Sequence, residues 1–262
     1  MYSKFHIRSL SILTLLVLVF PAVSAFAQLT PENESGVTMG HVHLLVPDVE
    51  AHKKLWVDLF GAEVTHAGPL EMLKIPGIII LIIKGQPASA AGDPVVDHFA
   101  LVVQDLSATK KKLAAANIRM PEGRAIAEFP DGVRVEFIED KSMGVPVAFH
   151  HFHIYTKDVE AIRNWYVKTY GGIKFPAGPN FPGGEMRFTQ TDQPRVPTKG
   201  HAIDHISFEV KDLPEFCKRL EAQGTKLDMA IVDAREKIGL RVTFVTDPVG
   251  TRTELTEGLA GK

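Results

Sequence analysis

The chain has 262 residues, of which 45% are hydrophobic and 23% charged, which is typical of a soluble protein with one large or two ordinary domains. A formal net charge of -2 leaves no basic surplus, so we expect no nucleic-acid partner. The single cysteine, Cys217, excludes an intramolecular disulfide.

Residues 1–27 have the layout of a secretory signal peptide. A charged start with Lys4 and Arg8 precedes an apolar run over residues 10–23 and an Ala-Phe-Ala sequence at residues 25–27. The apolar run is too short for an ordinary membrane span. We therefore expect cleavage and export to the periplasm or the medium, with no stable membrane insertion afterwards. An uncleaved N-terminal anchor is the alternative.

One frame then occurs four times along the chain: a His stands seven residues before an Asp, with an apolar, strand-like run between them. The four pairs are His41 and Asp48, His98 and Asp105, His151 and Asp158, and His205 and Asp212. Each Asp is suited to cap the start of a helix. The predicted helices end near residues that tolerate a left-handed backbone, namely Gly61, Asn117, Gly171 and Gly224.

About three further strands fit after each predicted helix, so each copy is predicted to be a βαβββ module. Loop-like stretches rich in Pro and Gly separate the modules. We place the boundary between two halves near Met143. The predicted domains are residues 38–142 and residues 147–257, each with two modules.

The alternation of side chains predicts which way the histidines face. In the fourth copy Ile206 and Phe208 share one face of the strand, and His205 and Glu209 share the other. The apolar face needs a cover, and the helix of the same module is available to provide it. The His face then lines the inside of a curved, cup-like sheet.

Two glutamates complete the pattern. The segments "PDGVRVEF" and "PVGTRTEL" match position by position and place Glu136 and Glu254 on the polar face of a last strand. Two His and one carboxylate facing one cavity can hold a divalent first-row metal, Fe, Mn, Ni or Zn, and leave positions open for a substrate. The alternative for each Glu is an exposed ion pair with the Arg two residues earlier.

The grouping of these ligands stays open. Pairing of modules within each half gives two triads, His41, His98 and Glu136, and His151, His205 and Glu254. Pairing across the halves uses the same residues in different groups. The odd copies have no matching Glu: Leu81 stands near that place in the first copy, and Glu185 is out of register in the third.

From residue 38 to residue 257 the chain resembles the vicinal oxygen chelate superfamily, which includes glyoxalase I, methylmalonyl-CoA epimerase, bleomycin resistance proteins and extradiol dioxygenases. The resemblance is carried by "DHISFEVKDL" with "DPVGTRTEL" and by "DHFALVVQDL" with "FPDGVRVEF". It implies an α+β fold in which four βαβββ modules pair into two open eight-stranded cups. The helices are expected on the outer face.

The resemblance implies a metal-dependent, glyoxalase-like enzyme of the isomerase, lyase or epimerase type. Such an enzyme chelates the vicinal oxygens of a small-molecule substrate. His153 and Glu209 are the candidate bases, with His43 in the other half. The candidate substrate-binding residues are Arg252, which suits an anionic group, Tyr155 and Phe244. A monomer or a homodimer is expected.

Two other functions remain open. One is an extradiol ring-cleaving dioxygenase. The resemblance to those enzymes implies a Tyr at the position of Phe244 and a further His shortly upstream, but this chain has Phe244 there and no His in "AREKIGLRV". The other is a non-catalytic protein that binds a small molecule, as bleomycin resistance proteins do.

Overall fold

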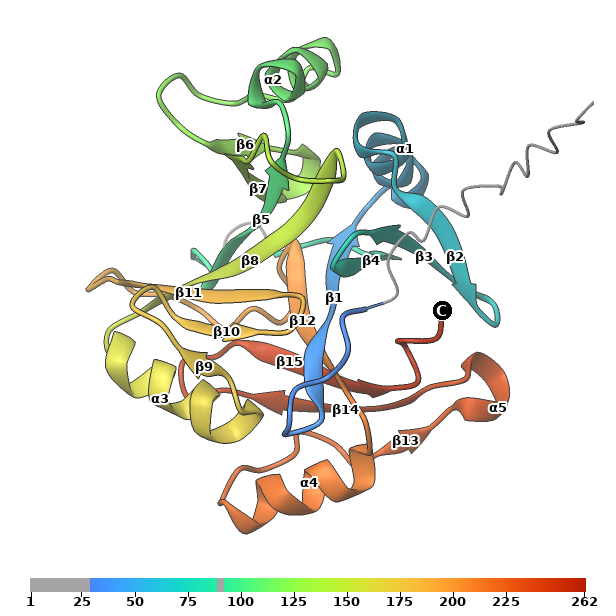
Figure 1. The fold of residues 1–262 in the computed structure, drawn as a ribbon, viewed down its shortest axis with the longest axis vertical. Helices are drawn as coiled ribbons and strands as arrows, with labels where there is room; N and C mark the ends of the chain where they lie inside the picture. Colours follow the sequence, from blue (N-terminus) through green and yellow to red (C-terminus); the bar gives the residue numbers. More distant parts are fainter. Residues whose placement is uncertain (1–28, 89–91) are drawn as a thin grey trace, which may run out of the picture.

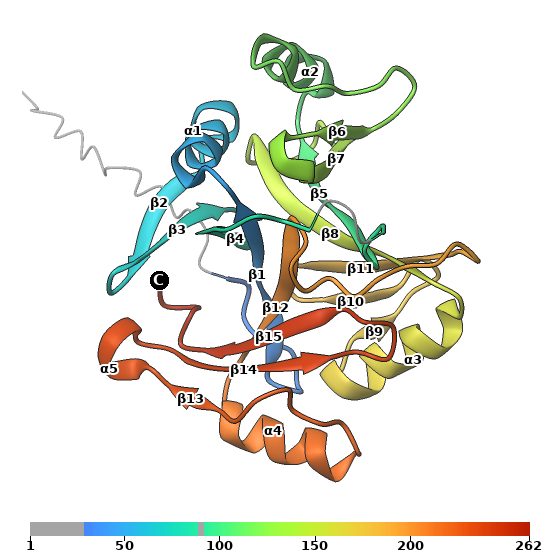
Figure 2. The same cartoon turned by 180° about the vertical axis from the view of Figure 1, so that it is seen from behind.

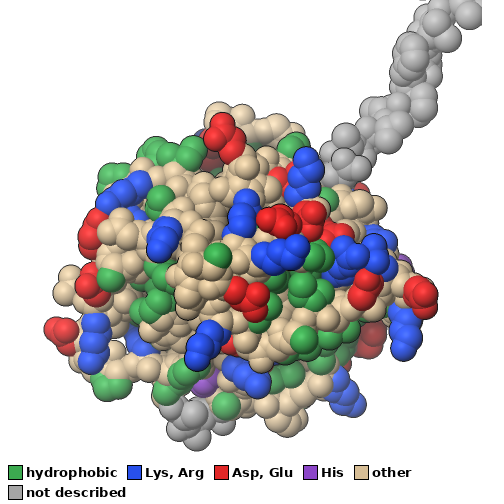
Figure 3. Space-filling view, turned by 90° about the horizontal axis from the view of Figure 1, so that it is seen from below, with side chains coloured by type: hydrophobic (Ala, Val, Ile, Leu, Met, Phe, Trp, Pro, Cys, Tyr) green, Lys and Arg blue, Asp and Glu red, His purple; other side chains and the backbone are tan. Residues whose placement is uncertain are grey.

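The computed structural model of the chain describes residues 29–88 and 92–262. The predicted signal peptide, residues 1–27, lies outside this part. No helix within the described ranges is both long and apolar enough to cross a bilayer. Basic and acidic side chains are intermingled over the face seen in Figure 3, in line with the small net charge.

The structure contains four modules, as the repeat predicts. The first comprises β1 (Val37–Val46), α1 (Val49–Phe60), β2 (Glu63–Ala67), β3 (Leu70–Ile75) and β4 (Ile78–Lys84), and the second β5 (Val96–Val103), α2 (Leu106–Ala115), β6 (Ile126–Glu128) and β7 (Arg134–Glu139). The third comprises β8 (Val147–Thr156), α3 (Val159–Tyr170), β9 (Ile173–Lys174), β10 (Pro179–Phe181) and β11 (Gly184–Gln190). The fourth comprises β12 (Ile203–Val210), α4 (Leu213–Ala222), β13 (Val232–Asp233), α5 (Arg235–Ile238), β14 (Arg241–Thr246) and β15 (Arg252–Glu257).

The repeated Asp residues cap the four main helices. Each side chain accepts a hydrogen bond from the backbone N–H three residues later, which satisfies a donor that the first turn leaves free. The capping residues are Asp48, Asp105, Asp158 and Asp212. Gly61 and Gly171 then end α1 and α3 in the left-handed conformation, at φ of 67° and 71°. The predicted helix boundaries are therefore confirmed.

The modules pair across the two halves of the chain. One sheet has the order β13-β14-β15-β12-β1-β4-β3-β2, so it combines the fourth and first modules. The other has the order β6-β7-β5-β8-β11-β10-β9 and combines the second and third (Figures 1 and 2). β1 runs antiparallel to β12, and β5 runs antiparallel to β8. The α+β fold of paired modules in two curled sheets is confirmed, and the pairing joins the sequence halves.

The second sheet has seven strands where eight were expected. The missing strand belongs to the segment after α2, which contains Pro121 and Gly123. Proline has no N–H to donate to a ladder, and here only Arg119 forms an isolated bridge, with Glu128.

The apolar faces of the two sheets and the helices form a shared core. Trp56 of α1 packs against Phe129 of the second module, with ring centroids 5.1 Å apart, and against Phe99 of β5. Tyr170 of α3 stacks on Phe208 of β12 at 4.5 Å. These contacts belong to one continuous cluster of buried residues. The opposite, concave face of each sheet is left for the histidines.

Candidate metal centre

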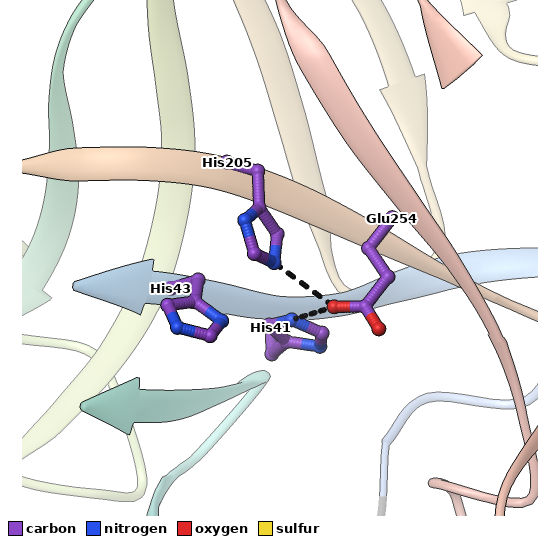
Figure 4. A group of neighbouring side chains, drawn as sticks. All are labelled: His41, His43, His205 and Glu254. Atoms are coloured by element: carbon purple, nitrogen blue, oxygen red, sulfur yellow. Dashed lines mark hydrogen bonds and ion pairs between the residues drawn. The ribbon is translucent and has the colours of Figure 1, made fainter. Parts of the chain in front are cut away.

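β1 and β12 bring three histidines together on the concave face of the first sheet. His41 and His43 are two residues apart on β1 and therefore share one face of the strand. His43 lies directly opposite His205 of β12. The rings of His43 and His205 are 4.2 Å apart, and those of His41 and His205 are 5.6 Å apart. Figure 4 shows all three side chains pointing into the same space.

Glu254 completes this group from the neighbouring strand β15. Its Oε2 atom lies 3.0 Å from Nε2 of His41 and 2.9 Å from Nε2 of His205 (Figure 4). The donor atoms of His41, His43, His205 and Glu254 all lie within 4.8 Å of one another. We call these four residues the first centre. Its residues come from the first and fourth modules. The triads that pairing within each half would give are therefore not formed, and the ligands are grouped across the halves instead.

The first centre fits a metal ion by its geometry. Ligand atoms at about 2.1 Å from a metal and at right angles to each other are about 3.0 Å apart, which matches both distances to Glu254. His41 is 1% exposed, and neither of its ring nitrogens makes a well-formed hydrogen bond within the described part of the chain. A buried nitrogen without such a bond is costly unless another partner is present. A divalent cation would be that partner.

Sequence reasoning missed Asp204, which orients His205. Its Oδ1 atom lies 2.6 Å from Nδ1 of His205 and accepts a hydrogen bond of 2.9 Å from Arg252. A carboxylate on the far ring nitrogen fixes the imidazole orientation and directs Nε2 toward the metal position. The Asp-His dipeptide in the second and fourth copies is the signal that could have revealed it.

The ionisation of the first centre follows from burial and pairing. Burial alone would lower the pKa of His205, but its hydrogen bonds to Asp204 and Glu254 prevail and raise it. Burial opposes the charge on Glu254, yet the hydrogen bond with His205 and the close approach of His41 prevail and lower the pKa of this carboxylate. Burial lowers the pKa of His43 to about 3, with the neighbouring histidines adding to the effect. His43 is thus neutral at pH 7.

The predicted substrate residues Arg252 and Phe244 lie beside the first centre. The ring of Phe244 meets the ring of His205 edge-on, with centroids 5.1 Å apart. The guanidinium of Arg252 lies over the Phe244 ring, 3.7 Å from its centroid. Because Arg252 also bonds Asp204, it supports the orientation of His205. Contact with a substrate stays a prediction for both residues.

Glu209 faces the same side of β12 but serves another contact. It is four residues from His205, about 13 Å along the strand. Its carboxylate accepts hydrogen bonds from Thr256 Oγ1 at 2.6 Å and from the backbone N–H groups of Gly258 and Leu259 at 2.7 and 2.8 Å. These bonds hold the segment after β15 against the sheet. The predicted role of Glu209 as a base gains no support from this position.

An apolar wall adjoins the first centre on the concave face. Leu259, held by Glu209, packs there in a buried cluster with Met72 of β3 and Leu81 of β4. Leu81 lies directly beside His43. This wall excludes water from one side of the centre, which strengthens electrostatic interactions inside it.

The second sheet holds a related group on β5, β7 and β8. Glu136 Oε2 lies 3.4 Å from Nε2 of His98 and 3.3 Å from Nε2 of His151. His153 stacks on His98 at 4.6 Å, and Asp97 Oδ2 lies 2.7 Å from Nδ1 of His98. We call His98, Glu136, His151 and His153 the second centre. All predicted metal ligands therefore fall into two groups.

The candidate base and substrate residues from the third module belong to the second sheet. Burial lowers the pKa of His153 to about 4, and its Nε2 lies 2.8 Å from the hydroxyl of Thr189. Tyr155 lines a cavity of about 490 Å³ between α3 and the β14–β15 turn, where the guanidinium of Arg195 lies over its ring at 4.1 Å. His153 and Tyr155 thus serve a different cup from Arg252.

The sequence model of the Glyoxalase/Bleomycin resistance protein/Dioxygenase superfamily matches residues 38–142 and 148–255. The chain belongs to this superfamily. The search of curated proteins found no match.

Solved structures show the same fold at low sequence identity. Glyoxalase I from Zea mays is 15% identical, with 86% of this chain and 94% of that chain covered at a TM-score of 0.65. A protein from Bacillus subtilis described as a dioxygenase is 14% identical, with 88% and 86% covered at a TM-score of 0.62. At such identities the likeness concerns the fold alone, and the chemistry has to be argued from the residues.

Proposed function

We propose that the chain is a metal-dependent enzyme of the glyoxalase type, an isomerase, lyase or epimerase that chelates the vicinal oxygens of a small molecule. The first centre is the proposed active site. The convergence of His41, His205 and Glu254 at separations of 2.9 to 3.0 Å carries this proposal. We also propose that the mature chain acts outside the cytoplasm after loss of residues 1–27.

The bound metal would polarise a substrate carbonyl and acidify the adjacent C–H or O–H group. His41, His205 and Glu254 would hold it with two neutral nitrogens and one anionic oxygen. Asp204 fixes the orientation of His205, and Arg252 in turn holds Asp204. The chain therefore supplies a pre-oriented donor set, which is what catalysis at a metal requires.

His43 is the best placed proton acceptor in the first centre. Its ring lies 4.2 Å from that of His205, and its Nδ1 atom is buried without a hydrogen-bond partner within residues 29–88 and 92–262. With a pKa lowered by burial to about 3, it is neutral at pH 7. A pKa of about 3 makes His43 a weak base, so its position beside the proposed metal ligands, and not its pKa, supports the assignment as the group that takes up the proton an isomerase or epimerase has to move.

The first test is metal content. Residues 28–262, purified without chelator, should contain a first-row metal that His205→Ala and Glu254→Gln lose. His66→Ala is the matched control because the His66 side chain is 55% exposed and lies outside both centres. Wild-type protein that is metal-free and also refuses added Fe, Mn, Ni and Zn would refute the proposal.

The reaction class can be tested by proton exchange. In deuterated water, the loaded enzyme should catalyse exchange at the carbon next to the carbonyl of small α-hydroxycarbonyl compounds, followed by proton NMR. His43→Ala should retain the metal and lose this exchange. If the variant exchanges as fast as the wild type, His43 is not the base.

An extradiol dioxygenase is the second candidate. Two His and one carboxylate with open positions are the donor set of non-haem Fe(II) oxygenases, which favours it. Against it, Phe244 offers no hydroxyl next to His205. Oxygen uptake by the Fe(II)-loaded protein in the presence of catechol would replace our proposal with this one.

A further inference from the structure

The two centres differ at one position that the strand register makes equivalent. In each sheet, the two central strands each carry one of the four repeated histidines. The residue two places after that His lies beside a residue of the parallel neighbouring strand. In the first sheet these neighbours are Glu254, beside Ser207, and Leu81, beside His43. In the second sheet they are Glu136, beside Ala100, and Arg187, beside His153. Arg187 therefore stands where the first centre has the uncharged Leu81.

The rest of the donor set is the same in both centres. Each has three His, one Glu, and an Asp on the far nitrogen of one His: Asp204 in the first and Asp97 in the second. The donor atoms differ in how closely they gather. Glu254 belongs to the compact group of the first centre, whereas the compact group of the second contains three histidines without Glu136.

The positive charge of Arg187 reaches the second centre. Burial lowers the pKa of His151 to about 2, and the charge of Arg187 is the next contribution. The same charge makes a smaller contribution to the lowered pKa of Glu136, after the effects of His98 and His153. Glu185 pairs with Arg187 at 3.0 Å and lies beside His151 in the register of β11 and β8, so it balances part of the charge.

A guanidinium at this position opposes a divalent cation. Arginine stays protonated at every pH at which the protein is folded, so the repulsion cannot be relieved by losing a proton. The Arg187 side chain is 32% exposed, and solvent therefore weakens the repulsion without removing it. Leu81 exerts no such repulsion on the first centre.

We infer that the chain holds a single metal ion, at the first centre, and that Arg187 keeps the second centre free of metal. This inference rests on the proposed function, because it assumes that the first centre binds metal. Arg187 supplies the positive charge that would otherwise come from a cation and balances the carboxylate of Glu136. Two chemically similar cups in one chain thus become one metal site and one metal-free pocket.

Titration with Co²⁺, followed by visible absorption and by metal analysis after gel filtration, tests this. The wild type should bind one equivalent, which His205→Ala loses and His98→Ala keeps. Arg187→Leu should bind a second equivalent, with affinity at the second centre raised by roughly tenfold or more. Arg187→Lys is the charge-matched control and should stay at one.

The outcomes separate the two proposals. Two equivalents in the wild type, or only one in a folded Arg187→Leu protein, would overturn the inference and leave the proposed function standing. No metal in the wild type would refute the proposed function. In that event the single ion at the first centre is refuted as well; one equivalent in Arg187→Leu would still support the exclusion of metal by Arg187, and none would overturn it. Circular dichroism of each variant confirms that it is folded.

Discussion

Glu209 carries a carboxylate in a place that water hardly reaches, since the residue is 3% exposed. Burial raises its pKa to about 7, although Thr256 and the backbone N–H groups of Gly258 and Leu259 oppose the shift. The folded protein therefore keeps a proton there that the unfolded chain releases. The stabilising contribution is complete below pH about 4.5 and is lost as the pH rises through 7.

Glu209→Gln removes this titration and keeps the shape of the side chain. We expect the variant to match the wild type in free energy of unfolding near pH 4. Above pH 7 it should be more stable, by up to about 3 kcal/mol. Urea denaturation at a series of pH values measures the difference. A constant difference across the range would show that Glu209 does not titrate as described.

At the scale of single elements, the start of β12 decides how the first centre is oriented. Asp204→Asn should weaken metal binding by about 10- to 100-fold, because an amide holds the His205 imidazole less firmly than a carboxylate does. Asp97→Asn changes the corresponding residue of the second sheet and should leave metal affinity unchanged. Isothermal titration of both apoproteins makes the comparison. Equal losses in the two variants would assign both residues a general structural role.

The elements were largely predictable, and their contacts were less so. Alternation along strands predicted that His41, His205 and Glu254 face the same side, and the Asp caps predicted the helix starts. The same alternation hid Asp204, because neighbours in a strand point to opposite faces, whereas this side chain at the strand start reaches back to His205. Arg187 could not be placed either, since its register with His153 depends on how the short strands β9 and β10 fold.

For the whole molecule, the decisive feature is the pairing of modules across the halves. All four modules share similar apolar patterns, so the sequence left open which would pair. What selects partners is tertiary packing, such as Trp56 of the first module against Phe99 and Phe129 of the second. Local propensity carries no information of that kind, and the ligand groups therefore remained undecided until the two sheets were known.

A shared core predicts that both sheets unfold together. Trp56 is fully buried between them, and Trp56→Ala should cost about 3 to 5 kcal/mol of stability. Calorimetry should show one transition, shifted to lower temperature. Trp165→Ala, at a partly exposed site on α3, should cost less. Two separate transitions in the wild type would show that the sheets are independent units.

The module order also bears on the time course of folding. The second and third modules, which pair with each other, are consecutive in the sequence. The first and fourth modules, which also pair, flank them on either side. Short loops close faster and at lower entropic cost than long ones. The inner sheet can therefore assemble while the chain is still incomplete, whereas β1 must wait for β12 and β15. The proposed metal ligands on β1 thus meet those of β12 and β15 at the end of folding, and a truncated chain that lacks the fourth module would have no first centre at which to capture a metal.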